Sequence, residues 1–286
     1  MSAPEFRKYH GLGNDYLVVD PGDADFDPTP EAVRAICDRN YGVGSDGILY
    51  GPLHDSSGLD LRIFNPDGGE AEKSGNGLRI FAWYLHERGL LKADGMRIAT
   101  KGGVVFARVA DAARRIVTID MGEPSFSAAD IGIAASWPEL VDREMTFGLH
   151  TLRATCVSMG NPHCVILLPG VTAETARELG PAIEGDPLFS RRTNVQFLEP
   201  VSRSRIRIEI WERGAGYTLA SGSSSCAAAA AARRLGLVDD SVTVMMPGGE
   251  LGVEFADGHA WLTGPVEPVF EGRFASELRE RMGPRR

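Results

Sequence analysis

Apolar and polar residues alternate along several short stretches of the chain, which predicts half-buried β-strands. Every second residue is apolar from Leu59 to Ile63 and again from Ile206 to Ile210. Because successive side chains of a strand point to opposite faces, this period of two places one face against a core. Clusters of Pro, Gly and Asp separate these stretches from further ones. The other predicted strands are 16–20, 96–100, 104–109, 116–121, 165–168, 194–198, 242–246 and 251–255.

Three amphipathic stretches predict helices at the surface. The first begins after Thr29, whose side chain can cap it, and has Pro30 in its first turn. The second is expected at 172–179 and should end at Gly180, because glycine commonly follows the last turn of a helix. The third is expected at 274–282, near the C-terminus. Together these predict a strand-rich chain with few helices.

Two other helices are apolar on nearly every face, which is typical of helices in the interior. One runs on from Leu78 to the charged pair Glu87 and Arg88. The other contains six consecutive alanines at 227–232, followed by Arg233 and Arg234. Basic residues and glycine close both, as the helix dipole favours. We therefore expect two central helices, each wrapped by its own sheet.

A glycine-rich turn with a serine precedes each central helix. The first turn reads Ser-Gly-Asn-Gly at 74–77 and the second reads Ser-Gly-Ser-Ser at 221–224. Ser74 and Ser221 are 147 positions apart, about half the chain. This repeat predicts two domains of the same design, 1–122 and 123–265. We expect the tail, 266–286, to return to the first domain.

Each of these turns can bind an anion. The N-terminus of a buried helix offers unpaired N–H groups and about half a positive charge, which attract carboxylate or phosphate. Glycine lets the backbone approach a ligand closely. For Ser74 or Ser221 alone, a simple helix cap is the more common role. Two serines in matched turns favour a shared site for a small anion.

Several asparagines can complete such a site. Asn14, Asn65 and Asn161 lie in turn-like segments, and Asn194 begins a predicted strand. Each alone is more often a turn former than a ligand contact. Together they offer the amide donors and acceptors that a polar zwitterion requires.

His163, Glu212 and Arg213 are the candidate charged or titratable groups. His163 is a candidate general base or orienting group, although a histidine near a strand is more often a hydrogen-bonded core residue. Glu212 and Arg213 follow a strand and can hold the charged ends of a substrate, with arginine gripping a carboxylate through two hydrogen bonds. A surface ion pair is the more common outcome for such a dipeptide.

Composition excludes several classes of function. The formal net charge of −9 argues against nucleic acid as a partner. No apolar run reaches the ~18 residues of a membrane span, and the N-terminus lacks the apolar core of a signal peptide. The motifs for a dinucleotide loop and a nucleophile elbow are incomplete, and there is no Walker A loop. His163 and Cys164 are adjacent without other ligands at metal spacing, which argues against a zinc site. The four cysteines are irregularly spaced and predict reduced thiols in a cytosolic protein; they are Cys37, Cys156, Cys164 and Cys226.

With these turns and asparagines the chain resembles the diaminopimelate epimerase family over nearly its whole length. The resemblance implies an α/β (α+β) fold of two similar domains, each a curled, mainly antiparallel sheet around a buried central helix, with the active site between them. It implies an epimerase without a cofactor that interconverts LL- and meso-diaminopimelate, a precursor of lysine and peptidoglycan. The blocks that match in order are 8–16, 42–47, 64–68, 75–79, 159–163, 212–216 and 247–249.

The family moves a proton at the α-carbon with two cysteines on opposite faces of the substrate. By position, Ser74 and Ser221 stand here in place of those cysteines. The resemblance also makes His163 and Glu212 assistants of the catalytic pair. It assigns the substrate's amino and carboxylate ends to Asn14, Asn65, Asn161, Asn194, Glu212 and Arg213. It assigns the helix-start donors to Gly75, Asn76, Gly222 and Ser223.

The two serines leave alternatives open, because a hydroxyl is far less acidic than a thiol and needs an adjacent base. One alternative is a divergent homologue that binds an amino acid without epimerising it. Another is a related isomerase or dehydratase, in which Ser74 or Ser221 does different proton chemistry with His163 or Glu212. In each case we expect a small amino-acid ligand, no nucleic acid, no membrane and a cytoplasmic location. A homodimer is left open.

Overall fold

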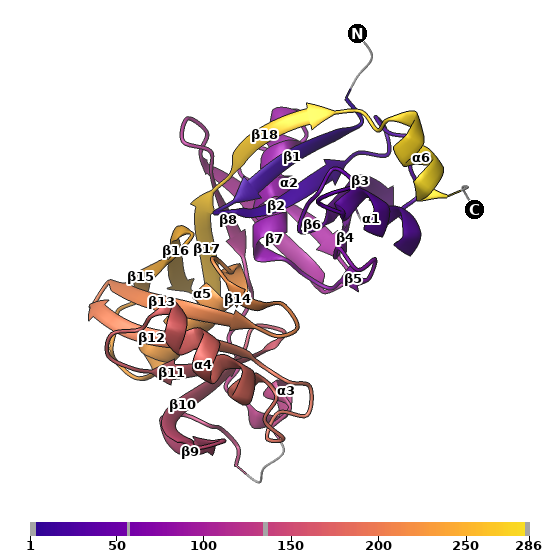
Figure 1. Ribbon diagram of the computed structural model, residues 1–286. Coiled ribbons are helices and arrows are strands. Elements are labelled where there is room, and N and C mark those ends of the chain that lie inside the picture. The colour runs from indigo at the N-terminus through magenta and orange to yellow at the C-terminus, as the bar shows by residue number, and fades with distance from the viewer. Residues whose placement is uncertain (1–3, 56–57, 134–136, 284–286) are drawn as a thin grey trace. The chain divides into compact units, whose positions relative to one another are not determined.

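The computed structural model describes residues 4–55, 58–133 and 137–283 of the chain (Figure 1). The predicted domain ranges and the predicted tail also include 1–3, 56–57, 134–136 and 284–286, which lie outside the described residues. The chain forms two compact units, residues 1–119 with 264–286, and residues 120–263. The limits inferred from the sequence, after residues 122 and 265, remain a proposal for the extent of the two epimerase-like domains.

The first unit is built around α2 (Gly75–Glu87), whose residues from Gly75 to Leu85 are all buried. The helix packs against β1, β2, β3 and β7. Its surface is apolar on nearly every side, which explains why it needs strands around it rather than on one face. In hydrogen-bonded order the strands are β18 (Glu267–Gly272), β1 (Phe6–Gly11), β2 (Asn14–Val19), β3 (Ile48–Asp55), β4 (Gly58–Phe64), β6 (Met96–Thr100), β7 (Gly103–Asp111) and β8 (Ile116–Asp120), with the short β5 (Glu70–Ala71) beside β4.

The second unit is built in the same way around α5 (Gly222–Arg234), whose alanines are all buried. This helix packs against β10, β11, β12, β13, β15 and β16. Small alanine side chains let these strands approach the helix axis closely. In hydrogen-bonded order the strands are β9 (Arg143–Phe147), β10 (His150–Ser158), β11 (Pro162–Leu167), β12 (Asn194–Ser202), β13 (Arg205–Glu212), β15 (Ser241–Met246), β16 (Gly249–Ala256) and β17 (His259–Pro265), with β14 (Gly216–Thr218) beside β13.

The two sheets repeat one another strand for strand. In the first unit, β1–β2 is antiparallel, β2–β3 parallel, β3–β4 antiparallel, β4–β6 parallel and β6–β7 antiparallel. In the second, β10–β11, β11–β12, β12–β13, β13–β15 and β15–β16 follow the same alternation. The central helix enters after the fourth strand of each series, through a short added strand. The duplicated design expected from the serine turns is therefore confirmed.

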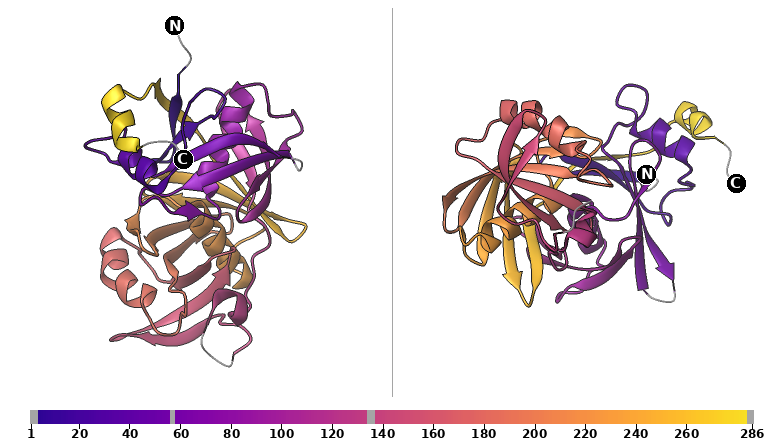
Figure 2. Two further views of the ribbon diagram at one scale, coloured as in Figure 1. Left: turned by 90° about the vertical axis from the view of Figure 1, so that its right-hand side faces the viewer. Right: turned by 90° about the horizontal axis from the view of Figure 1, so that it is seen from below.

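The remaining helices cover the sheets from outside. They are α1 (Pro30–Cys37), α3 (Ala128–Ile131), α4 (Ala173–Glu184) and α6 (Ser276–Met282). The predicted cap of α1 is confirmed, since Thr29 accepts a hydrogen bond from the Ala32 N–H at 3.2 Å. Helix α6, the last helix of the chain, lies beside α1 in the first unit (Figure 2). No helix within the described ranges is long and apolar enough to cross a membrane.

Two helix boundaries differ from the prediction. Helix α4 does not end at Gly180 but continues through Pro181 to Glu184. A Cβ atom at Gly180 would lie 2.5 Å from Cγ of Trp211, so the glycine allows close packing rather than ending the helix. Helix α6 starts at Ser276 instead of Phe274, because Phe274 belongs to the apolar core of the first unit.

All ten predicted strand runs overlap strands of the structure, but several strands were not expected. The missed strands lack a clean alternation of apolar and polar residues. Strand β3 contains Gly51 and Pro52, which normally indicate a turn. Strand β18 exposes most of its side chains, so its sequence carries no core-facing pattern. The short helix α3 was also missed.

Candidate active site: two serine-capped helix N-termini

Ser74 caps the central helix of the first unit, as predicted. Its Oγ atom accepts a hydrogen bond from the Gly77 N–H at 3.1 Å, and its backbone is extended. The hydroxyl of Tyr16 lies 3.1 Å from the same Oγ atom, and either group can donate. Ser74 itself is partly exposed, whereas Gly75 and Asn76 behind it are buried. The serine thus presents a hydroxyl at the positive end of a buried helix.

Asn14 and Asn76 are joined in one chain of hydrogen bonds. The Asn76 Nδ2 group donates to Oδ1 of Asn14 at 2.9 Å, and Asn76 Oδ1 accepts from the fully buried Arg79 at 2.8 Å. At the other end, the Asn14 amide donates to Asp46 at 2.9 Å. This series of hydrogen bonds orients both side-chain amides. It therefore holds the Asn14 turn against the start of α2.

An ion-pair cluster fixes the far side of the Asn14 turn. Arg39 reaches Asp15 at 2.8 Å and Asp46 at 2.7 Å, and Lys8 reaches Asp15 at 2.7 Å. Burial alone would raise the pKa of Asp15, but the hydrogen bonds from Arg39 and Lys8 outweigh it and hold that pKa below its usual value. Asp15 is therefore ionised at neutral pH and anchors the turn through two cations.

Asn65 lies in a separate turn of the same unit. Its N–H donates to the Gly69 carbonyl at 2.8 Å, and its carbonyl accepts from the Gly68 N–H at 3.0 Å. The side chain is exposed and makes no hydrogen bond to residues that the structure describes. The backbone role of a turn former is thus confirmed, and the amide stays available for a ligand.

Ser221 caps the central helix of the second unit, again as predicted. Its Oγ atom accepts from the Ser224 N–H at 3.4 Å, and its carbonyl accepts from the Ser225 hydroxyl at 2.8 Å. Only 5% of Ser221 is exposed. Gly222 is buried and Ser223 is partly exposed. The two units therefore repeat the same local device, a serine cap on a buried helix.

His163 is completely buried on β11. Its Nε2 atom lies 3.0 Å from Oδ1 of Asn161, and because an amide oxygen can only accept, Nε2 carries the proton. Burial lowers the pKa of His163 to about 3; the neighbouring Gln196 opposes this change and the charge of Arg213 adds to it. The imidazole is therefore neutral at physiological pH. In this structure it orients Asn161.

Gln196 on β12 neighbours His163 and contacts the start of α5, and it was not among the predicted site residues. Its Nε2 group donates to the Ser224 hydroxyl at 3.0 Å. Among the described residues, Nδ1 of His163 and Oε1 of Gln196 have no hydrogen-bond partner. Exchanging the amide nitrogen and oxygen would let Gln196 donate to Nδ1 and accept from Ser224. A polar residue inside an apolar strand was the signal that could have revealed it.

Asn194 and Arg213 form a second support in this unit. Asn194 is buried; its Nδ2 group donates to the Pro162 carbonyl at 3.1 Å, and its Oδ1 accepts from the Arg213 N–H at 3.0 Å. The exposed Arg213 side chain donates to the carbonyl of Arg191 at 2.9 Å. Asn194 thus positions the turn that carries Arg213.

Glu212 ends β13 just before that turn and is half-buried. Its carboxylate accepts a hydrogen bond from the hydroxyl of Thr218 on β14 at 3.1 Å. Glu212 therefore joins β13 to β14, the short strand that precedes the Ser221 turn. In this unit the structure pairs His163 with Asn161, and Asn194 with Arg213. The residues predicted in the first unit lie along the Asn14, Asn65 and Ser74 turns.

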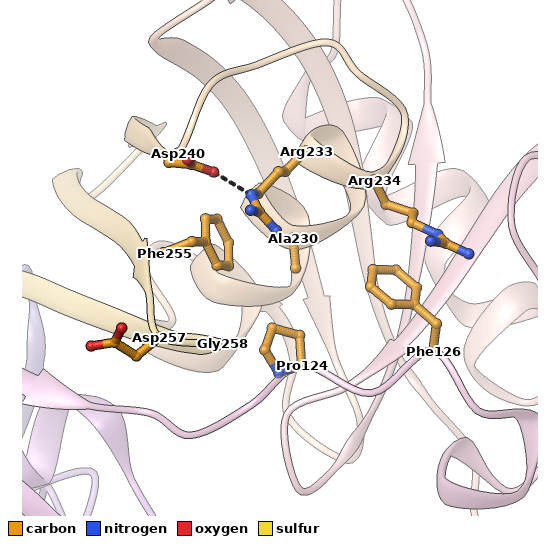
Figure 3. Close-up of a pocket in the computed structure, with 9 residues that line it drawn as sticks. All are labelled: Pro124, Phe126, Ala230, Arg233, Arg234, Asp240, Phe255, Asp257 and Gly258. Carbon is orange, nitrogen blue, oxygen red and sulfur yellow. Dashed lines mark hydrogen bonds and ion pairs between the residues drawn. The ribbon is translucent and has the colours of Figure 1, made fainter.

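A pocket of about 410 Å³ lies at the opposite end of α5 (Figure 3). Arg233 pairs there with Asp240 at 2.5 Å and lies over the ring of Phe255, while Arg234 pairs with Glu139 at 2.7 Å. Because both guanidinium groups are already paired, the pocket offers little to an anion. Its lining residues are Pro124, Phe126, Ala230, Arg233, Arg234, Asp240, Phe255, Asp257 and Gly258.

The described side chains include no group of three or more His, Cys, Asp or Glu residues placed to hold a metal ion. Each of the two helix starts offers hydroxyl, amide and backbone N–H groups. Such groups can bind a carboxylate and stabilise negative charge that develops beside it.

A family model described as diaminopimelate epimerase matches residues 6–127 and 155–269. The chain belongs to the diaminopimelate epimerase family. It is 49% identical to Diaminopimelate epimerase 2 of Nostoc sp. over 276 residues, which cover 96% of both chains. It is 40% identical to the diaminopimelate epimerase of Moorella thermoacetica, with 94% of this chain and 98% of that protein covered.

Solved structures show the same fold at low sequence identity. A predicted epimerase from Pseudomonas aeruginosa aligns with a TM-score of 0.65 and 18% identity, over 96% of this chain and all of that one. A hydroxyproline epimerase from Agrobacterium vitis also aligns with a TM-score of 0.65, at 17% identity over 93% of this chain and 90% of that one. The predicted fold class, two similar domains with a central helix each, is confirmed.

Proposed function

We infer that the protein is a cofactor-independent epimerase that interconverts LL- and meso-diaminopimelate by moving the α-proton. Relatives that are 40–49% identical over nearly the whole chain carry the name diaminopimelate epimerase. The observation that carries the inference is the pair of serine-capped buried helices, each at the same place in a duplicated sheet. A two-base reaction at one carbon requires two such groups, one for each face.

In this proposal Ser74 and Ser221 stand for the two proton-transferring groups. The N–H groups at the helix starts bind the substrate carboxylate and stabilise the carbanion formed when the α-proton leaves. Those N–H groups belong to Gly75, Asn76, Gly222 and Ser223. They suit this role because a buried helix start has free donors and a positive dipole end.

The remaining predicted residues bind the ends of the substrate. Arg213 grips a carboxylate, and Glu212 holds an ammonium group and assists Ser221 as a base. Asn14, Asn65, Asn161 and Asn194 orient the substrate or the groups that hold it. His163 acts as a neutral group that orients Asn161, because its pKa of about 3 excludes an imidazolium at neutral pH.

Incubation with LL-diaminopimelate in D₂O tests the proposal. NMR would follow loss of the α-proton signal and appearance of the meso isomer. The Ser74→Ala and Ser221→Ala proteins serve as controls for contaminating activity. Folded wild-type protein that exchanges the α-proton no faster than these variants would contradict the proposal.

Binding without turnover is the second candidate, and the serines favour it. An alcohol is a far weaker acid than a thiol, and Ser221 is only 5% exposed. The binding groups around both serines are nevertheless present. Calorimetry with the diaminopimelate isomers would show binding without exchange if this candidate is correct, and no binding would contradict it.

A homodimer and a cytoplasmic location complete the proposal. Val269 and Phe270 expose 51% and 47% of their surface on β18, as apolar residues of a subunit interface do in an isolated chain. The four cysteines are free and buried, which suits a reducing compartment. Light scattering that gives only the monomer mass of 30.8 kDa would contradict the dimer.

A further inference from the structure

We propose that Tyr16 is the proton-transfer partner of Ser74. This inference rests on the proposed epimerase function, since it concerns how Ser74 can act without being a thiol. The Tyr16 hydroxyl lies 3.1 Å from Ser74 Oγ. The two residues are separated by 58 positions in the sequence, so their contact is a product of the fold and of no local motif.

The ring of Tyr16 is held in one place. Only 6% of the residue is exposed. A Cβ atom at Gly47 would lie 2.7 Å from Cε1 of the ring and 2.4 Å from the Phe64 carbonyl oxygen. The ring therefore occupies space that opens only because residue 47 is glycine. With the ring fixed, the hydroxyl is directed at the start of α2.

The chemistry of the two hydroxyl groups is complementary. A phenol loses its proton near pH ~10, whereas a serine hydroxyl needs an adjacent group before it reacts. Ser74 Oγ also accepts the Gly77 N–H, so negative charge on this pair lies at the N-terminus of a buried helix. The helix end stabilises the phenolate that a proton transfer would leave on Tyr16.

The step concerns reprotonation of the substrate carbanion on the Ser74 face. Ser74 gives its hydroxyl proton to the α-carbon, forming the new C–H bond. The electron pair of that bond comes from the carbanion. At the same time the Tyr16 O–H bond breaks and its proton restores the Ser74 hydroxyl, so one negative charge moves from carbon to the phenolate. The reverse reaction runs through the same atoms in the opposite order.

The second unit has no such pair in the equivalent place. Tyr16 follows Gly13 and Asn14 at the start of β2, and His163 follows Gly160 and Asn161 in the same way on β11. His163 donates to Asn161 and is neutral. The relay, by which we mean proton transfer from Tyr16 to Ser74, is therefore specific to the first unit. Ser74 has a neighbouring tyrosine hydroxyl, and Ser221 does not have one in the equivalent place.

Tyr9 is a matched control on the neighbouring strand. It pairs directly with Tyr16 across β1 and β2. Its hydroxyl donates to the Glu87 carboxylate at 2.6 Å, at the C-terminal end of α2. Tyr9→Phe thus removes a hydroxyl that contacts the same helix but lies at its other end.

The test compares Tyr16→Phe with Tyr9→Phe in diaminopimelate epimerisation. We expect Tyr16→Phe to lower kcat by about 100-fold, the usual contribution of acid–base catalysis, with KM changed by less than about threefold. Tyr9→Phe should leave kcat within about threefold of wild type. Equal losses in both variants, or no loss in Tyr16→Phe, would overturn the inference.

A cysteine background separates a relay from a structural role. A thiol at residue 74 transfers its proton without help, so Tyr16→Phe should cost less than about threefold in the Ser74→Cys protein. The same 100-fold order of loss in both backgrounds would mean that Tyr16 only supports the fold, and would overturn the relay.

A measurement without substrate keeps this inference distinct from the proposed function. Tyrosine labelled with ¹³C at Cζ gives an NMR signal for Tyr16, assigned with Tyr16→Phe. Ser74→Ala should shift that signal and leave the Tyr9 signal unchanged. An inert wild-type enzyme would reject the proposed function alone, whereas a Tyr16 signal that ignores Ser74→Ala would reject the pair itself.

Discussion

Nε2 of His163 lies 3.0 Å from Oδ1 of Asn161, and no part of His163 is exposed to solvent. The imidazole therefore holds one tautomer and serves the asparagine beside it. The sequence left His163 open as a general base or an orienting group, and burial in this structure leaves it neutral and out of reach of water. Its chemistry is now that of a fixed hydrogen-bond donor.

Burial of neutral His163 should make the protein less stable in mild acid. The pKa of about 3 in the folded state lies below the ordinary value of 6.5, so the unfolded chain binds the extra proton. Above about pH 6.5 the titration of His163 does not lower the free energy of unfolding. Below that pH, the free energy of unfolding falls by about 1.4 kcal/mol per pH unit until about pH 3. Thermal unfolding of wild type and His163→Gln between about pH 4 and 8 would show it. If the melting temperatures of the two proteins change with pH in the same way, the expectation is contradicted.

Restoring thiols should raise epimerase activity. In the Ser74→Cys, Ser221→Cys double variant each thiol lies at a helix N-terminus, which lowers a thiol's pKa toward neutrality. We expect kcat on LL-diaminopimelate to rise by at least about tenfold over wild type. The single variants serve as controls, since each leaves one face with a serine. A folded double variant that stays inert would show that the pocket no longer accepts diaminopimelate.

Removing the Asp46 carboxylate should loosen the Asn14 turn. Asp46 accepts from the Asn14 side chain at 2.9 Å and from the Asp15 N–H at 3.1 Å. Asp46→Ala leaves both donors without this partner, which costs about 1–3 kcal/mol of stability. We expect KM for diaminopimelate to rise more than kcat falls. Asp38→Ala is the control, because Asp38 caps the nearby 40–41 backbone and does not contact Asn14. A KM equal to that of the control would contradict the positioning role.

Gly180→Ala should destabilise the protein, against the preference of an isolated helix. Alanine in a helix interior is normally more stable than glycine by about 0.8–1 kcal/mol. At Gly180 the new Cβ would lie 2.5 Å from Cγ of Trp211, and overpacking of this kind costs about 1–3 kcal/mol. Gly185→Ala is the matched control, since its nearest atom would be 3.5 Å away. Chemical denaturation that finds Gly180→Ala as stable as Gly185→Ala would contradict the packing explanation.

The sequence alone predicted those features that depend on residues close together in the chain. The Thr29 cap, the serine caps of both central helices and the all-round apolar character of α2 depend on residues a few positions apart. The repeated turns, 147 positions apart, also predicted the duplication. Each of these follows from capping chemistry and hydrophobic periodicity, which act within a turn or two of chain.

Only the tertiary structure decided how distant residues meet. It brought Tyr16 to Ser74, placed Gln196 between His163 and the start of α5, and set Trp211 against Gly180. None of these contacts has a local signature, because sheet pairing joins strands that are far apart in the chain. The sequence by itself therefore determined the family, the repeat and the two capped helix starts. Burial and long-range packing determined which serine lies beside a tyrosine hydroxyl, and which histidine is kept neutral.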